Sequence, residues 1–382
     1  MAENASAQSG RLARLLNVLE QDPNNLQLIA NAASAALDEG DAGKAMTLLD
    51  RYAALEPLPP ELVNLQGLAA LGEGRWDDAA ASFERLLADG RDEPAIRLNL
   101  AWARSGAGDS EGALALIDDA VLAIGAAAAA LKIQLLHDLE RLDEALESGA
   151  ALADLYPAAE ELMGALASVA LDAERLDLAG SYAARAGHNQ DGTAARGLLL
   201  MEANRTAESI ALFNEVLARD AEHPRALLGK GLAILAAGEP AQAAPFLDRA
   251  AQRFRDHLGS WVAAGWAYYV AGDLAQSRAR FETALALDDT FGETHGGLAV
   301  LDLAGGDIES ARKRCDVALR LDRNCFSGAL AKSMLLEQDG DPASAQRIRE
   351  RAMAHPLDAS GRTIARALGE MAPASAGRRP NQ

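Results

Sequence analysis

Seven glycines recur at a fixed spacing along this 382-residue chain. They form two series with neighbours 34 residues apart: Gly40, Gly74 and Gly108, and then Gly238, Gly272, Gly306 and Gly340. Each stands in a short polar stretch, such as GEGRWDDA or VAGDLAQS. Self-similarity at this period predicts stacked two-helix repeats rather than one globular core. A solenoid of this kind offers a long surface to a partner.

The composition favours an all-helical protein. The chain is 49% hydrophobic but only 4% aromatic, because alanine supplies much of the apolar content. Alanine is the best helix former, and its small side chain lets helices approach closely. The net charge of −20 opposes nucleic-acid binding as the main role, since such binding needs cations that replace the counterions at phosphates.

No segment of the sequence has the pattern of a membrane span or an export signal. The longest apolar run, residues 120–131, has 12 residues, whereas about 20 are needed to cross a bilayer. The first ten residues lack the positive charge and the apolar stretch of a secretory signal. These observations predict a cytoplasmic protein without membrane insertion.

The clearest repeat lies on both sides of Gly272. Trp261, Ala264, Gly265 and Tyr268 follow the spacing of one helix face, which predicts a first helix, here helix A. Ser277, Phe281 and Ala284 do the same on a second helix, helix B. This register assigns Trp261 and Phe281 to the core.

Glycines inside helix A need a packing reason, because each costs about 1 kcal/mol relative to alanine. They occur at Gly67, Gly197, Gly231 and Gly265. In each repeat a larger helix B residue stands where it could fill the space beside the missing side chain. These residues are Phe83, Phe213, Leu247 and Phe281, respectively.

This pattern resembles the tetratricopeptide repeat family. The resemblance rests on the turn glycines, on a small residue in helix A and on an alanine in helix B. The helix A residues are Ala33, Gly67, Ala101, Gly197, Gly231, Gly265 and Ala299, and the helix B residues are Ala45, Ala79, Ala113, Ala145, Ala179, Ala243, Ala311 and Ala345. The resemblance implies an all-α, right-handed superhelical solenoid of about ten repeats, with the A helices along its concave side. The alanine-rich composition with more arginine than lysine resembles that of proteins from high-GC bacteria, and the chain resembles bacterial members of the family that consist almost entirely of repeats.

The repeats are expected to begin at residues 26, 60, 94, 126, 160, 190, 224, 258, 292 and 326 and to end near 356. A capping helix is expected over 11–25 and another over 357–371, with disordered ends at 1–10 and 372–382. The 34-residue spacing is disturbed twice, between Gly108 and Glu140 and between Glu174 and Asn204. The stretch GHNQDGT at 187–193 is the best break signal, and predicts a hinge or a change of curvature between blocks 11–189 and 190–356.

No catalytic, cofactor or metal motif stands out. The six histidines show no HExxH spacing, and the chain has no CxxC pair, phosphate-binding loop or GxSxG turn. Cys315 and Cys325 are interpreted as buried thiols, with a redox pair left open. The sequence therefore predicts a protein that is not an enzyme and that has no cofactor and no metal site.

The resemblance implies a binding groove along the A helices. Its expected partner-binding residues are Asn64, Leu68, Asn99, Trp102, Arg225, Leu232, Val262, Trp266, Tyr269 and Met334, and Val300 falls on the same face. The paired lysines of the family's clamp for a C-terminal carboxylate are missing. The groove is instead rather apolar, which suits an amphipathic helical or extended segment of a partner. For Trp102, Trp266 and Tyr269, packing against neighbouring helices remains an alternative to partner contact.

The predicted function is a non-catalytic scaffold or adaptor for one or more protein partners. By resemblance, bacterial relatives serve as accessory proteins in assembly, secretion or envelope complexes. Two alternatives stay open: a dedicated chaperone that holds a secreted or aggregation-prone client, and an enzyme or small-ligand sensor with a site inside the superhelix. Self-association also remains open.

Overall fold

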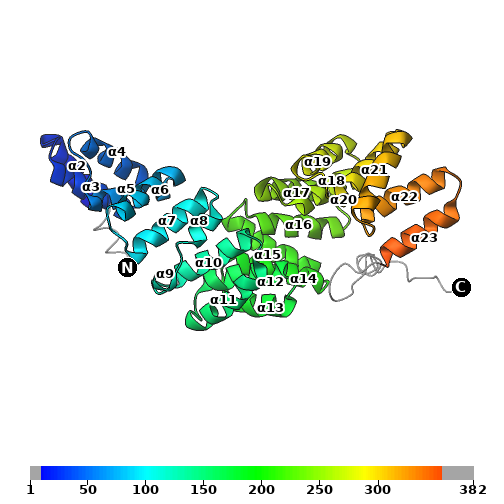
Figure 1. The fold of residues 1–382 in the computed structure, drawn as a ribbon, viewed down its shortest axis with the longest axis horizontal. Helices are drawn as coiled ribbons and strands as arrows, with labels where there is room; N and C mark the ends of the chain where they lie inside the picture. The colour runs from blue at the N-terminus through cyan, green and yellow to red at the C-terminus, as the bar shows by residue number, and fades with distance from the viewer. Residues whose placement is uncertain (1–9, 355–382) are drawn as a thin grey trace, which may run out of the picture. The chain divides into compact units, whose positions relative to one another are not determined.

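The structure is a computed structural model that describes residues 10–354. Within that range all the regular secondary structure is α-helical (Figure 1). The chain divides into two compact units, unit 1 up to Val169 and unit 2 from Ala170 onwards. The capping helix expected at 357–371, the tail at 372–382 and residues 1–9 lie outside the described residues.

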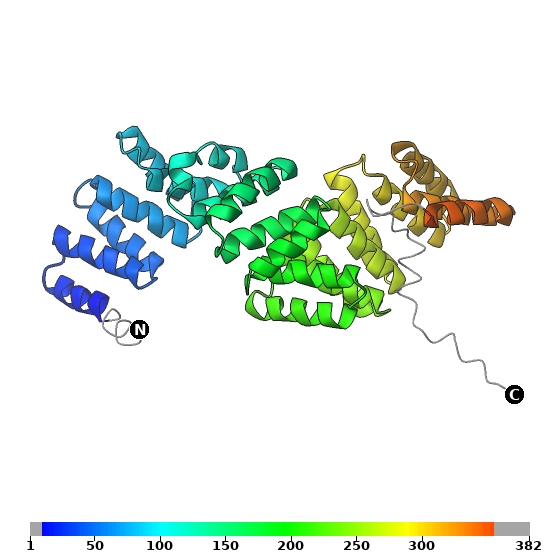
Figure 2. The same cartoon turned by 90° about the horizontal axis from the view of Figure 1, so that it is seen from below.

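Unit 1 is a series of antiparallel helices, most of which pack against the next helix in the chain (Figure 2). Helix α2 (Arg11–Gln21) lies where the first capping helix is expected, and its buried Leu12 and Leu19 belong to the core of the unit. The repeats follow as α3 (Leu26–Asp38) with α4 (Ala42–Ala53), α5 (Pro60–Gly72) with α6 (Trp76–Ala88), α7 (Pro94–Gly106) with α8 (Ser110–Leu114) and α9 (Asp119–Leu122), and α10 (Ala126–Asp138) with α11 (Leu142–Leu155). Helix α12 (Glu160–Asp172) contains the division between the units.

Unit 2 continues the same arrangement. Its helices are α13 (Leu176–Arg185), α14 (Gln190–Glu202) with α15 (Thr206–Arg219), α16 (Pro224–Ala236) with α17 (Pro240–Phe254), α18 (Leu258–Val270) with α19 (Leu274–Leu287), α20 (Gly292–Ala304) with α21 (Ile308–Leu321), and α22 (Phe326–Gln338) with α23 (Pro342–Met353). Each of the ten A helices begins at the first residue of its expected repeat, so the all-α solenoid of ten repeats is confirmed. A hinge at 187–193 stays a prediction.

The turn between helix A and helix B has one backbone conformation throughout. All seven spaced glycines have a positive φ, between +68° and +88°, which glycine adopts without steric cost. Where the spacing is disturbed, Glu140, Glu174 and Asn204 take the same position with φ between +56° and +59°. In five turns an aspartate follows the glycine and accepts a hydrogen bond from a backbone amide of helix B, as Asp41 does from Lys44 N at 2.8 Å. The glycine ends one helix and the aspartate begins the next.

Repeat 3 differs from the others because its helix B is broken. Helix α8 ends at Leu114, and α9 begins after Asp118, whose carboxylate accepts a hydrogen bond from Val121 N at 3.0 Å. Gly108 and Glu140 are 32 residues apart, so this repeat is two residues shorter than the 34-residue period. The sequence predicted a shift in register here but not two short helices.

The glycines inside helix A lie against large side chains, as the sequence predicts. A Cβ atom built on Gly67 would lie 2.6 Å from Cζ of Phe83, and one on Gly231 would lie 2.6 Å from Cγ of Leu247. The corresponding closest approaches are 2.5 Å between Gly197 and Phe213 and 2.9 Å between Gly265 and Phe281. All four large side chains are fully buried. Close helix contact, rather than flexibility, therefore explains these glycines.

Two of the phenylalanines also contact the A helix of the following repeat. A Cβ on Gly229 would lie 2.3 Å from the ring of Phe213, and one on Gly297 would lie 2.4 Å from the ring of Phe281. Each ring is therefore held between a glycine of its own repeat and a glycine of the next. This arrangement connects neighbouring repeats through a single side chain.

The same substitution is expected to have opposite effects at two helical glycines. Gly67→Ala should lower the free energy of unfolding by up to about 2 kcal/mol, because overpacking against Phe83 costs about 1–3 kcal/mol and helix propensity returns about 1. Gly180→Ala should raise it by about 0.5–1 kcal/mol, since the new Cβ would meet its nearest neighbour, Leu199, only at 3.9 Å. Chemical denaturation of both variants checks this. A stabilised Gly67→Ala variant would contradict the packing explanation.

The assignment of Trp261 to the core is wrong. The side chain is only half-buried, and its indole Nε1 donates a hydrogen bond to the backbone oxygen of Arg255 at 2.7 Å. Phe281, from the same register, is fully buried as predicted. The polar nitrogen explains the difference, since an indole N–H needs a partner and finds it at the joint between repeats.

Both cysteines are buried and free, as predicted. Burial raises the pKa of Cys315 to about 11. Burial and the neighbouring Glu293 also raise the pKa of Cys325. These thiols stay protonated at neutral pH and are therefore poor nucleophiles.

Candidate interaction surface

Helix α18 supplies the aromatic centre of the A-helix face in unit 2. The ring centroids of Trp266 and Tyr269 lie 5.5 Å apart in an edge-to-face arrangement, and Trp266 makes a similar contact with Phe281 at 5.5 Å. Trp266, Tyr269 and Val262 are each half-buried. Part of every side chain therefore packs on the core, and the remainder is accessible to a partner.

These side chains pack against the next two A helices. Trp266 and Tyr269 belong to the cluster formed by Val300 and Leu303 of α20, and Met334 of α22 joins the same cluster. The structure thus brings Val262, Trp266, Tyr269 and Met334 together in connected clusters. Partner contact and packing are not alternatives here, because the same side chains have both buried and accessible parts.

Val300 does not line an open groove, contrary to expectation. It is fully buried, and α20 is buried along most of its length. Glycines cause this burial, since a Cβ on Gly296 would lie 2.4 Å from Gly328 N of α22. The two A helices approach so closely that α20 has little free surface.

Leu232 extends the apolar surface on α16. It is half-buried and packs on a cluster that includes Ala264 and Ala267 of α18. We call Leu232, Val262, Trp266, Tyr269 and Met334 together the unit 2 face.

Arg225, also on α16, is already engaged within the protein. Its guanidinium donates two hydrogen bonds to Asp172 at 2.9 and 2.7 Å, and only 14% of the side chain is exposed. Burial alone would lower the pKa of Arg225, but the hydrogen bonds and charge of Asp172 raise it above its usual value. As a partner-binding residue Arg225 stays a prediction, and the geometry gives it a structural role.

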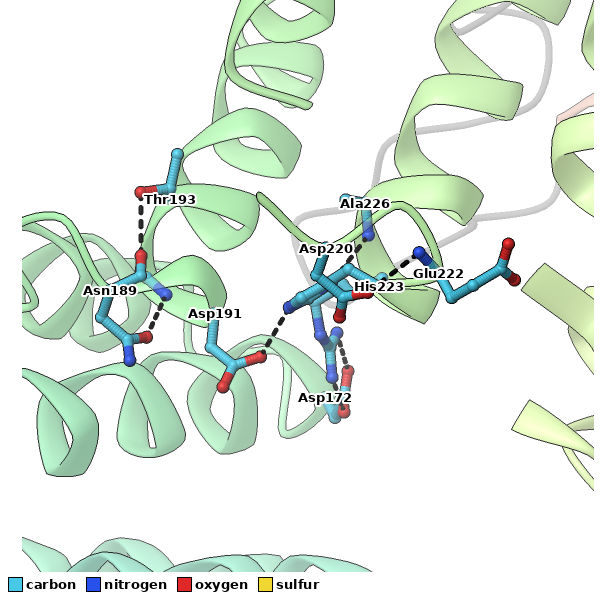
Figure 3. A network of polar contacts seen from close by, with 10 residues as sticks. Asp172, Asn189, Asp191, Thr193, Asp220, Glu222, His223 and Ala226 are labelled. Atoms are coloured by element: carbon cyan, nitrogen blue, oxygen red, sulfur yellow. Dashed lines mark hydrogen bonds and ion pairs between the residues drawn. The ribbon is translucent and has the colours of Figure 1, made fainter. Parts of the chain in front are cut away.

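A polar network surrounds this ion pair (Figure 3). Buried His223 lies 3.1 Å from Asp191, and its Nδ1 accepts the backbone N–H of Ala226 at 3.3 Å at the start of α16. An accepting Nδ1 leaves the proton on Nε2, which then donates to Asp191. Asn189 caps α14 and also accepts a hydrogen bond from Thr193 through its backbone oxygen. The network fixes the starts of α14 and α16.

The residues of unit 1 that the sequence predicts to bind a partner lie on α5 and α7. Trp102 is 37% exposed, while Asn64, Leu68 and Asn99 are half-buried. Among the described residues neither asparagine amide takes part in a hydrogen bond. These amides and the Trp102 ring are therefore available to a ligand.

A buried carboxylate in unit 2 with two arginine partners was not predicted from the sequence. Asp302 of α20 is buried and accepts a hydrogen bond from Arg278 at 2.7 Å, and Arg314 lies 3.0 Å from its second oxygen. An aspartate between apolar residues in VLDLA was the available signal. An aspartate in such an apolar run indicates a carboxylate that is buried and paired with cationic side chains.

The described residues hold no recognisable metal centre or membrane span. Between residues 10 and 354, no three histidine, cysteine, aspartate or glutamate side chains are placed together to hold a metal ion. None of the described helices combines the length and the apolar character that crossing a bilayer requires. The described surface is suited to binding through apolar and amide groups.

Comparison with known proteins identifies the family. Tetratricopeptide repeat families match residues 70–135, 194–257 and 268–335, which together make up just over half of the chain. The chain belongs to the tetratricopeptide repeat family. Members of this family are typically interaction modules without catalytic activity. No curated protein matches this sequence.

Solved structures show the same fold at low sequence identity. The structure of a monomeric IFIT1 mutant with Gppp-AAAA has a TM-score of 0.53 and 13% identity, and the match covers 90% of this chain and 94% of that one. A crystal structure of MamA has a TM-score of 0.35 and 15% identity, and the match covers 41% of this chain and 91% of that one. The IFIT1 similarity supports the solenoid fold alone.

Proposed function

We propose that this tetratricopeptide repeat protein is a non-catalytic scaffold that binds an amphipathic helix of a partner protein along the unit 2 face. The observation that supports it is the half-buried pair Trp266 and Tyr269, held by packing on one side and accessible on the other. Aromatic side chains fixed in this way are favoured anchors in protein interfaces, since little conformational entropy is lost on binding.

The chemistry of the surface sets the kind of partner. Val262 and Met334 belong to the same clusters as the two rings, and Leu232 stands on α16 at the repeat position of Trp266. This aliphatic area suits apolar residues at helical spacing on the partner. The net charge of −20 favours partners with a basic surface and raises their association rate. We infer a cytoplasmic accessory role in the assembly or secretion of a bacterial complex.

Replacing Trp266 by alanine is expected to weaken partner binding at least about tenfold, since an interface anchor is lost. Because part of the ring packs on Phe281, the variant should also lose about 1–2 kcal/mol of stability. Trp261→Ala is a matched control, because Trp261 is a half-buried tryptophan on the same helix but outside the unit 2 face. It should lose similar stability and retain binding.

The measurement is affinity capture with the wild type and both variants, followed by mass spectrometry and titration of the recovered partner. A protein retained by the wild type and by Trp261→Ala, but lost with Trp266→Ala, supports the proposal. Equal capture by both variants would contradict it, as would recovery of a metabolite without any protein. Suppression of client aggregation at stoichiometric ratios would favour a chaperone instead.

A further inference from the structure

A pocket of about 220 Å³ opens between the last two B helices of unit 2. Its lining comes from α21 and the turn after it, from α22 and from α23. These residues are Leu319, Arg323, Asn324, Ala329, Lys332, Ile348, Arg351 and Ala352. We call this pocket the α22 crevice.

Comparison of the repeats explains why the crevice is open. Ala329 is the fourth residue of its A helix, and the preceding repeats place His295 and Trp261 at the same position. Trp261 Nε1 bonds to the oxygen of Arg255 at 2.7 Å, and His295 Nε2 bonds to that of Asp289 at 2.8 Å. In both repeats a ring reaches the backbone oxygen six residues before it. Ala329 has no ring to reach back towards Arg323, so the space stays unfilled.

The crevice concentrates positive charge in an acidic protein. Arg323, Lys332 and Arg351 take part in no ion pair or hydrogen bond within residues 10–354, and no acidic side chain lines the pocket. Neighbouring arginines on the same helices are neutralised, since Arg312 contacts Asp339 and Arg349 contacts Glu337, each at 2.5 Å. Arg312 and, to a smaller extent, Lys332 lower the pKa of Asp339, but this carboxylate is already paired with Arg312 and does not line the pocket. Three cations without an ion-pair partner around one pocket favour an anionic ligand.

We propose that the α22 crevice binds an acidic peptide segment of a partner, with a carboxylate between the cations and an aliphatic side chain against Leu319 and Ile348. Charge complementarity selects this occupant. The chain's own residues 355–382 match the pocket less well, because they contain four arginines but only one aspartate and one glutamate.

This site is separate from the unit 2 face. Lys332 in the crevice and Met334 on the unit 2 face are two residues apart, which places them about 200° apart around the axis of α22. One A helix therefore presents a basic crevice on one side and an apolar surface on the other. A partner could occupy either site without the other.

The test is fluorescence anisotropy with the full chain and a labelled peptide, acetyl-Glu-Leu-Asp-Leu-Glu-amide. The neutral peptide acetyl-Gln-Leu-Asn-Leu-Gln-amide is the control ligand. We expect only the acidic peptide to bind, with an affinity that falls as salt rises. Ala329→Trp should weaken binding at least about tenfold, because the indole fills the space as Trp261 does in its own repeat.

A second variant separates binding from folding. Arg351 is exposed, so Arg351→Gln removes a cation without disturbing the core and should weaken binding about threefold to fivefold. Arg347→Gln on the same helix lies outside the crevice and should bind as the wild type does. Trp266→Ala should also leave peptide affinity unchanged, so failure of this proposal is distinguishable from failure of the scaffold proposal.

Three results would overturn the proposal. One is equal affinity for the acidic and the neutral peptide, and another is unchanged binding by both Ala329→Trp and Arg351→Gln. The third is a dimer in light scattering that disappears in the Ala329→Trp variant. Such a dimer would show that a second copy of this chain, rather than an acidic peptide, occupies the crevice. Displacement of the peptide by free glutarate at equal concentration would likewise indicate a small-anion site instead of a peptide site.

Discussion

Replacement of Phe281 by alanine is expected to lower the free energy of unfolding by about 3–5 kcal/mol, the range for deleting a buried aromatic side chain. The ring is fully buried and lies between Gly265 of its own repeat and Gly297 of the next. Glycines cannot extend into the space, so the cavity would stay open. The loss would fall on two neighbouring repeats, because one side chain supports both contacts.

Chemical denaturation measures the total effect, and amide hydrogen exchange locates it. Exchange should accelerate in α18–α20 before it does in unit 1, since repeat proteins are stabilised mainly by contacts between neighbours. Leu287→Ala on the same helix is the control, because that side chain is 47% exposed and should change stability little. Uniform acceleration along the chain would show that the repeats do not unfold locally.

The sequence predicts the repeat architecture unusually well because one constraint recurs in every turn. A positive φ is needed between helix A and helix B, and glycine is the residue that adopts it at least cost. Where Glu140 and Asn204 replace glycine, the conformation persists although the glycine signal is lost. Helix starts could still be assigned there, since the apolar spacing on both sides is unchanged.

Features that depend on contacts between repeats were harder to predict. Periodicity places Trp261 on the core face, yet its indole nitrogen turns to a backbone oxygen at the joint. The burial of Val300 follows from the close approach of Gly296 to α22, and spacing within one helix does not reveal such a contact. The partner of Arg225 lies 53 residues away in α12, outside the 34-residue register.

The α22 crevice could be predicted only in part from the sequence. Aligning the repeats puts Ala329 in the column that contains Trp261 and His295, but Ala129 stands in the same column and is fully buried, so a small residue there does not by itself indicate a pocket. The charges of Arg323 and Arg351 would not have been informative alone, because many of the described arginines of unit 2 form ion pairs and others do not. Only the structure shows which cations lack a partner.

Removal of the Asp248 carboxylate is expected to lower the free energy of unfolding by about 2–4 kcal/mol. Asp248 of α17 is 9% exposed and accepts two hydrogen bonds from Arg280 of α19, at 2.5 and 2.8 Å. The guanidinium also lies 5.4 Å from the ring centroid of Tyr268. Asp248→Ala leaves this cation partly buried without its counterion, and desolvation of an unpaired charge costs more than the pair contributes.

A double substitution tests that reason. Asp248→Ala combined with Arg280→Met removes both charges and keeps an apolar side chain against Tyr268, so it should recover more than half of the lost stability. Glu208→Ala is the matched control, because its ion pair with Arg205 is exposed and should contribute no measurable stability. Equal losses in the single and double variants, measured by chemical denaturation, would mean that the hydrogen bonds themselves hold α17 to α19. If the double variant recovers stability, the loss in Asp248→Ala comes mainly from leaving the Arg280 charge unpaired at the contact between α17 and α19.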